Sequence, residues 1–178
     1  MRHTFSYALA LLFMVSCGSK KTETQEAPQS EQNIDEVRSM PEYNYTDSLM
    51  QGSHRIVFTI TRQPDDELPI VVDEDGLKYK DNRYTLVISK DGSTFFNKCF
   101  TKADFNSKLI KDLQKYGIMD GMRFDHAKEG KLYFNTCVTY PESDMSAPFI
   151  LTIGPDGSYS IEPDTSFDED IPAPAQIE

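Results

Sequence analysis

Short runs of β-branched and aromatic residues, separated by turns that contain glycine, constrain the fold of this chain more than any other sequence feature. In residues 54–61 every second position is strongly apolar, which is typical of a strand buried on one face. Asp73-Glu-Asp-Gly76 and Lys90-Asp-Gly92 each separate two such runs. Because glycine accepts the positive φ that tight turns require, each of these sequences predicts a β-hairpin.

One helix is expected in the middle of the chain. Thr101-Lys-Ala-Asp104 has the form of a capping box, apolar residues recur at helical spacing from Phe105 to Tyr116, and Gly117 provides a stop. Four further strands, which predict an antiparallel meander, lie at 121–126, 131–140, 147–154 and 158–162. Strand runs with one helix between them favour an α+β fold: a mainly antiparallel, curled sheet with one amphipathic helix packed on one face.

Composition divides the chain into four parts. Residues 1–16 combine a basic start with the apolar run 7–15 and predict a cleaved signal peptide. As a helix that run spans about 14 Å, against roughly 30 Å for a bilayer core, so it is too short to cross a membrane. Residues 17–42 consist mostly of Lys, Thr, Glu, Gln, Ser, Ala and Pro and predict a flexible tether. Residues 43–163 predict a single globular domain, and residues 164–178 a disordered acidic tail.

The end of the signal peptide carries the clearest functional motif. Met14-Val-Ser-Cys17 resembles the bacterial lipobox, although Met14 stands where leucine is commoner. The resemblance implies that the Cys17 thiol takes a lipid and becomes the mature N-terminus. Each buried methylene of an acyl chain contributes about 0.8 kcal/mol, so two or three chains would make anchoring permanent. The alternative is an ordinary signal peptide with an incidental cysteine.

Localisation follows from the same motif. We expect a protein that is exported and lipid-anchored to the bacterial cell envelope, at the outer membrane. Lys20-Lys21, rather than an acidic cluster, follows the cysteine, and this favours the periplasmic face over the cell surface. Together with the tether and the glycine-containing turns, the lipobox resembles those of a small uncharacterised lipoprotein domain family of Bacteroides-type bacteria. That resemblance implies no activity and no functional residue other than Cys17.

The charge balance limits the partners of the chain. It has 18 basic and 29 acidic residues, a net charge of −11, and removing residues 1–16 takes away one arginine and no acid, which leaves −12. Phosphate backbones are bound by clustered Lys and Arg, so we expect no nucleic-acid partner. Anionic lipid headgroups are disfavoured for the same reason. The expected partners are the membrane, through the lipid, and another envelope protein.

Two cysteines remain once Cys17 is lipidated. Cys99 and Cys137 both fall in predicted strands of a protein sent to an oxidising compartment. A disulfide between them would close a loop of about 40 residues and contribute about 3 to 4 kcal/mol. The other interpretation is two buried thiols that act as small hydrophobic side chains. The sequence leaves both open.

Known catalytic and metal-binding motifs are absent from the sequence. His54 and His126 lie in no ligand-spaced set, and the acidic runs 65–67, 73–75 and 168–170 lack the spacing of a calcium loop. No nucleophile elbow, phosphate-binding loop or dinucleotide fingerprint occurs. We therefore predict no catalytic residue, no cofactor and no metal site.

These observations leave three functional interpretations. The first is a tethered protein-binding or scaffolding module whose sheet or strand edges meet another envelope protein. The second is a carrier of a small ligand or lipid, with a pocket between helix and sheet. The third is a hydrolase, which would require two carboxylates, or a serine with His54 or His126, in one cleft.

Overall fold

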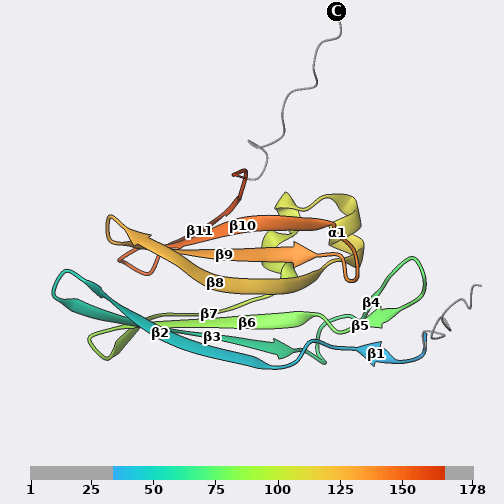
Figure 1. Ribbon diagram of the computed structural model, residues 1–178, viewed down its shortest axis with the longest axis horizontal. Coiled ribbons are helices and arrows are strands. Elements are labelled where there is room, and N and C mark those ends of the chain that lie inside the picture. Colours follow the sequence, from blue (N-terminus) through green and yellow to red (C-terminus); the bar gives the residue numbers. More distant parts are fainter. Residues whose placement is uncertain (1–33, 167–178) are drawn as a thin grey trace, which may run out of the picture. The chain divides into compact units, whose positions relative to one another are not determined.

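The computed structural model describes residues 34–166 (Figure 1). The predicted signal peptide, Cys17 and residues 167–178 of the predicted tail lie outside the described residues. The strands are β1 (Val37–Arg38), β2 (Tyr43–Gln51), β3 (His54–Pro64), β4 (Val71–Val72), β5 (Lys78–Tyr79), β6 (Asn82–Lys90), β7 (Ser93–Phe100), β8 (Ile118–Lys128), β9 (Lys131–Thr139), β10 (Ser146–Ile153) and β11 (Tyr159–Pro163). Between β7 and β8 lie a 3₁₀ helix, η1 (Lys102–Lys108), and a short α-helix, α1 (Lys111–Tyr116).

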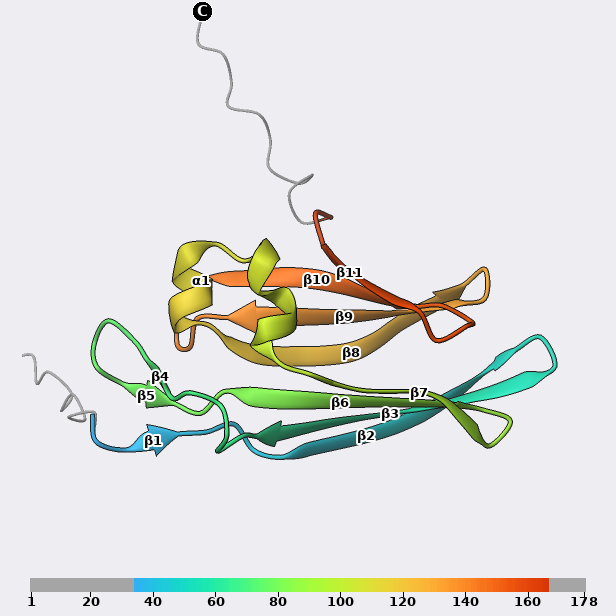
Figure 2. The ribbon, with the colours of Figure 1, turned by 180° about the vertical axis from the view of Figure 1, so that it is seen from behind.

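The strands form three sheets. The N-terminal sheet has the order β2-β3-β6-β7 and the C-terminal sheet the order β11-β10-β9-β8, and all neighbours in both are antiparallel. A small sheet of order β1-β5-β4 contains one parallel pair, β1 with β5. The two large sheets face each other, and the small sheet lies at the same end as the helices (Figures 1 and 2).

The core lies between the two large sheets. Alternate residues of β6 and β9 point inward, and the buried side chains of both sheets form one cluster. Phe58 of β3 meets Phe134 of β9 edge to face, with ring centroids 5.6 Å apart. Phe105, Leu109 and Leu113 of the helical segment are buried in the same cluster. The mainly antiparallel sheet prediction is confirmed. The single curled sheet is replaced by two sheets, because each has an apolar face that needs covering.

The predicted helix is split in two. Leu109 has an extended backbone, with φ −87° and ψ 144°, and it separates η1 from α1. The Gln114 side chain donates hydrogen bonds to the carbonyl oxygens of Asn106 (3.0 Å) and Leu109 (2.9 Å), so the break leaves these groups bonded. The Thr101 N–H donates to the Asp104 carboxylate (2.9 Å), as a capping box requires.

Gly117 follows α1 as predicted, but for another reason. Its φ is −74°, which other residues adopt freely, so it is no left-handed cap. A Cβ atom at this position would lie 2.5 Å from the Leu113 carbonyl oxygen and 2.7 Å from Cγ1 of Val138. Close packing of the chain against β9 therefore requires glycine here.

Both hairpins predicted from the turn sequences are present. Asp91 (φ 51°) and Gly92 (φ 84°) turn the chain between β6 and β7, and Gly76 (φ 84°) lies in the turn between β4 and β5. The four strands from β8 to β11 form the expected meander. Among the described residues, no helix has the length and apolar character needed to cross a membrane.

The N-terminal boundary of the folded part differs from the prediction. Val37 and Arg38, within the predicted tether, form β1 and pair with Lys78 and Tyr79. Strand β2 was not predicted from the sequence, because this edge strand is largely exposed and therefore carries polar residues as well as apolar ones.

Candidate functional site

The two cysteines of the domain lie in different sheets. Cys99 is in β7 and Cys137 in β9, and both are free thiols in the structure. Their neighbours Phe100 and Val138 are fully buried, and successive strand residues alternate in direction, so both thiols face away from the core. Cys99 is exposed, and only Cys137 is partly covered. Burial raises the pKa of the Cys137 thiol.

The two histidines are also kept apart by the fold. Nδ1 of His54 in β3 lies 2.6 Å from Oδ2 of Asp91, in the β6–β7 turn. Nδ1 of His126 in β8 lies 2.8 Å from Asp125, and its ring stacks on Tyr133. Each histidine therefore lies against an aspartate of its own sheet, and the two histidines do not contact each other.

The acidic turn 73–75 has a structural use. Oδ1 of Asp73 accepts hydrogen bonds from the backbone N–H groups of Asp75 (3.0 Å) and Leu77 (2.8 Å), which closes the β4–β5 turn. Within residues 34–166, no group of three or more His, Cys, Asp or Glu side chains is arranged to hold a metal ion.

The inner faces of the large sheets are filled by the protein's own side chains. Phe105 of η1 packs against Phe149 of β10, with ring centroids 5.0 Å apart, and Leu109 and Leu113 complete the same contact area. The inner-face pocket that a lipid carrier would need is therefore occupied by core side chains.

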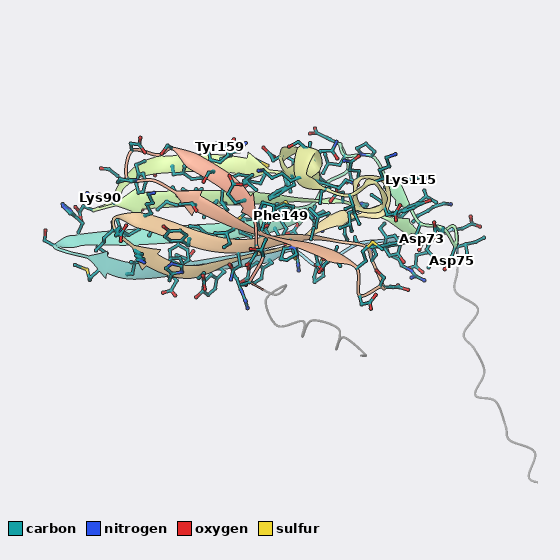
Figure 3. The ribbon with its side chains drawn as sticks, turned by 90° about the horizontal axis from the view of Figure 1, so that it is seen from above. Asp73, Asp75, Lys90, Lys115, Phe149 and Tyr159 are labelled. Atoms are coloured by element: carbon teal, nitrogen blue, oxygen red, sulfur yellow. The ribbon has the colours of Figure 1, made fainter. Side chains whose placement is uncertain are left out.

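A cleft of about 480 Å³ lies outside this core, between the stretch 68–72 and the helical segment. Lys102, Asn106, Gln114 and Lys115 line its helical side, and Asp81 contributes a carboxylate. Ile70 and Val72 line the opposite side, although 42% and 46% of their surfaces are exposed. Figure 3 shows Lys115 at the end of the domain that carries Asp73 and Asp75, with Lys90 at the opposite end.

Asp81 is the most deeply buried ionisable group of the cleft, with 4% of its surface exposed. Its Oδ1 accepts hydrogen bonds from the backbone N–H groups of Asn82 and Met119, both at 2.8 Å, and so joins β6 to β8. Its Oδ2 accepts no hydrogen bond from any described residue. Burial raises the pKa of the Asp81 carboxyl, and the two backbone donors offset only part of this effect.

Lys102 is the second perturbed group. Its Nζ donates a hydrogen bond to the Gly117 carbonyl oxygen (2.6 Å). Burial lowers the pKa of the Lys102 ammonium, and the negative charge of Asp81 opposes that shift. A carboxyl and an ammonium whose pKa values are both shifted by burial, and which line one cleft, mark a candidate functional site.

Sequence reasoning missed both residues. Lys80-Asp-Asn82 has the composition of a solvated turn between two strands, and Lys102 lies inside a capping box. Asp81 is buried because β8, which begins 36 residues after β6 begins, brings the Met119 N–H to it. A local sequence window contains no sign of that contact.

The fold and the cleft define a class: a domain of two facing antiparallel sheets with a polar and apolar surface cleft beside a small third sheet. The chain belongs to the DUF4738 family, a domain of unknown function, whose model matches residues 22–161. No curated protein matches the chain. The expected membership of an uncharacterised domain family is thus confirmed, and the lipobox and bacterial group stay predictions.

Proposed function

We propose that this protein is a lipid-anchored lipoprotein of the cell envelope whose domain binds another protein through the cleft between residues 68–72 and the helical segment. The Cys17 lipid would hold it to the outer membrane, on the periplasmic face, and the residues between Cys17 and β1 would link the anchor to the domain. The sequence motif supports the anchor, and the cleft supports the binding role.

The observation that carries the binding proposal is the exposure of Ile70 and Val72 at the cleft. Exposed apolar side chains beside a few convergent polar groups are the usual composition of a binding site. Here the polar groups are the Asp81 carboxylate and the Lys102 ammonium. Because the cleft lies outside the core, a partner reaches it without opening the domain.

The other two interpretations have less support. A carrier needs an inner-face pocket, and core side chains occupy that space. A hydrolase needs catalytic groups that converge in one cleft, whereas His54 and His126 belong to different sheets and neither lines the cleft.

The anchor is tested by the Cys17→Ala variant. The domain should fold as before, with an unchanged circular dichroism spectrum. It should be recovered free of membranes after cell fractionation, because position 17 then has no thiol to take the lipid. A Cys17→Ala protein that stays in the membrane fraction contradicts the proposed anchor.

The binding site is tested by photo-cross-linking in cells. A benzoylphenylalanine at Lys115, which lines the cleft, should give the same discrete adduct in repeated cultures. The matched control carries the probe at Lys90, at the opposite end of the domain, and should not give this adduct (Figure 3). Equal adducts at both positions, or none at Lys115, contradict binding at the cleft.

A further inference from the structure

The backbone of β4 has a free edge whose direction can be worked out from its pairing with β5. Val71 is opposite Tyr79 in this antiparallel pair, and the Asp73 N–H donates to the Leu77 carbonyl oxygen (3.0 Å). In an antiparallel ladder, alternate residues direct their peptide groups toward the partner strand and away from it. Val71 and Asp73 therefore face β5, and the N–H and C=O groups of Ile70 and Val72 face the other way.

These outward peptide groups have no partner in the described part of the chain. Strand β4 is the last strand of the small sheet, and no hydrogen bond is recorded for the backbone of Ile70 or Val72. Pro69 has no N–H, so the free ladder begins at Ile70. Both Ile70 and Val72 line the cleft. An unpaired edge beside a cleft is the arrangement that binds an extended peptide.

We propose that the cleft binds an extended segment of the partner protein, which adds to β4 as a further strand. This inference rests on the proposed function and specifies how the partner is recognised. The peptide groups of Ile70 and Val72 would provide up to four hydrogen bonds, and the exposed side chains of both residues would contact apolar side chains of the segment.

The polar groups of the cleft fit the same ligand. An added strand keeps N–H and C=O groups along its second edge. Asp81 provides an acceptor, Oδ2, that no described residue uses, and the Lys102 ammonium provides donors beyond the one given to Gly117. A peptide backbone is neutral and alternates donors and acceptors, so it can bond both the Asp81 carboxylate and the Lys102 ammonium. An anionic or a cationic ligand would be attracted by one of these groups and repelled by the other.

The test measures binding of a pool of blocked pentapeptides randomised among Val, Ile, Thr and Ser to the full chain carrying Cys17→Ala. Backbone recognition tolerates different side chains, so the pool should bind and should shift the NMR signals of Ile70 and Val72. Val72→Pro removes the outward N–H but no β4–β5 hydrogen bond, and should weaken binding at least tenfold. Val72→Thr keeps the N–H and should stay within threefold of the parent chain.

A second measurement does not depend on the proline variant. The same pool with N-methylated backbones cannot donate and should not bind the parent chain. The proposal is overturned if this pool binds as well as the unmodified one, if Val72→Pro binds like Val72→Thr, or if the unmodified pool does not bind at millimolar concentration. If the cross-link at Lys115 persists in those cases, protein binding at the cleft stands and only strand addition fails.

Discussion

Replacing Asp81 by alanine should destabilise the protein far more than replacing it by asparagine. The Asp81 carboxylate accepts two backbone N–H groups, from Asn82 and Met119, and both of these residues are fully buried. Alanine leaves both of these buried donors without their acceptor. Each unsatisfied buried donor costs about 1 to 3 kcal/mol, so the free energy of unfolding should fall by about 2 to 6 kcal/mol.

This loss is large compared with the total. A domain of this size is stable by about 5 to 15 kcal/mol, so Asp81→Ala should lose a large part of its free energy of unfolding at neutral pH. Asparagine keeps an acceptor oxygen in the position of Oδ1 and removes a buried charge. We therefore expect Asp81→Asn to stay within about 1 kcal/mol of the parent protein at pH 7.

The pH dependence gives a second readout. Burial raises the pKa of Asp81 in the folded protein, so the folded state holds this proton more tightly than the unfolded state. The resulting stabilisation is fully present below the unfolded pKa of about 3.9 and is lost as the pH rises through the folded pKa. Asparagine has no such proton, so Asp81→Asn should become more stable relative to the parent protein between acid and neutral pH.

Urea unfolding followed by circular dichroism measures both effects. The midpoints should change while the slopes stay equal, which shows that the same surface is exposed on unfolding. An Asp81→Ala protein within about 0.5 kcal/mol of the parent, or an Asp81→Asn protein as unstable as Asp81→Ala, would refute the assignment of Asp81 as the acceptor that joins β6 to β8.

Three further predictions follow from the packing. Gly117→Ala places a Cβ 2.5 Å from a backbone oxygen and should lower the free energy of unfolding in urea by about 1 to 3 kcal/mol. The control Gly121→Ala places its Cβ 3.1 Å from a thiol and should lower it less. Equal losses of stability would contradict the close approach at Gly117. In the Cys17→Ala chain, a thiol reagent should label Cys99 at once and Cys137 slowly. If neither cysteine is labelled, the two are oxidised. Burial raises the pKa of Tyr84 to about 12, so Tyr84 should be the last tyrosine to ionise in an absorbance titration. The stabilisation linked to this shift is present below about pH 10 and is lost as the pH rises toward 12. Tyr84→Phe should abolish this loss of stability at alkaline pH.

The local signals of the sequence predicted the strands and turns well. Asp91 and Gly92 adopt the positive φ values that their turn requires, and the meander from β8 to β11 follows the alternation of its residues. These features depend on interactions within a few residues along the chain, so they can be recognised without knowing what packs against them. The edge strand β2 was not predicted, because most of its residues are exposed and few of them are apolar on one face.

What the sequence by itself determined is therefore most of the strands from β3 onward, the capping box and the motif at Cys17. The tertiary structure decided how these parts meet. Two sheets face each other rather than one curling, Leu109 breaks the helix while joining the core, and Met119 arrives from β8 to bury Asp81. The cleft and the free edge of β4 depend on the same long-range contacts. Such contacts join residues that are far apart in the chain, so local sequence patterns do not predict them.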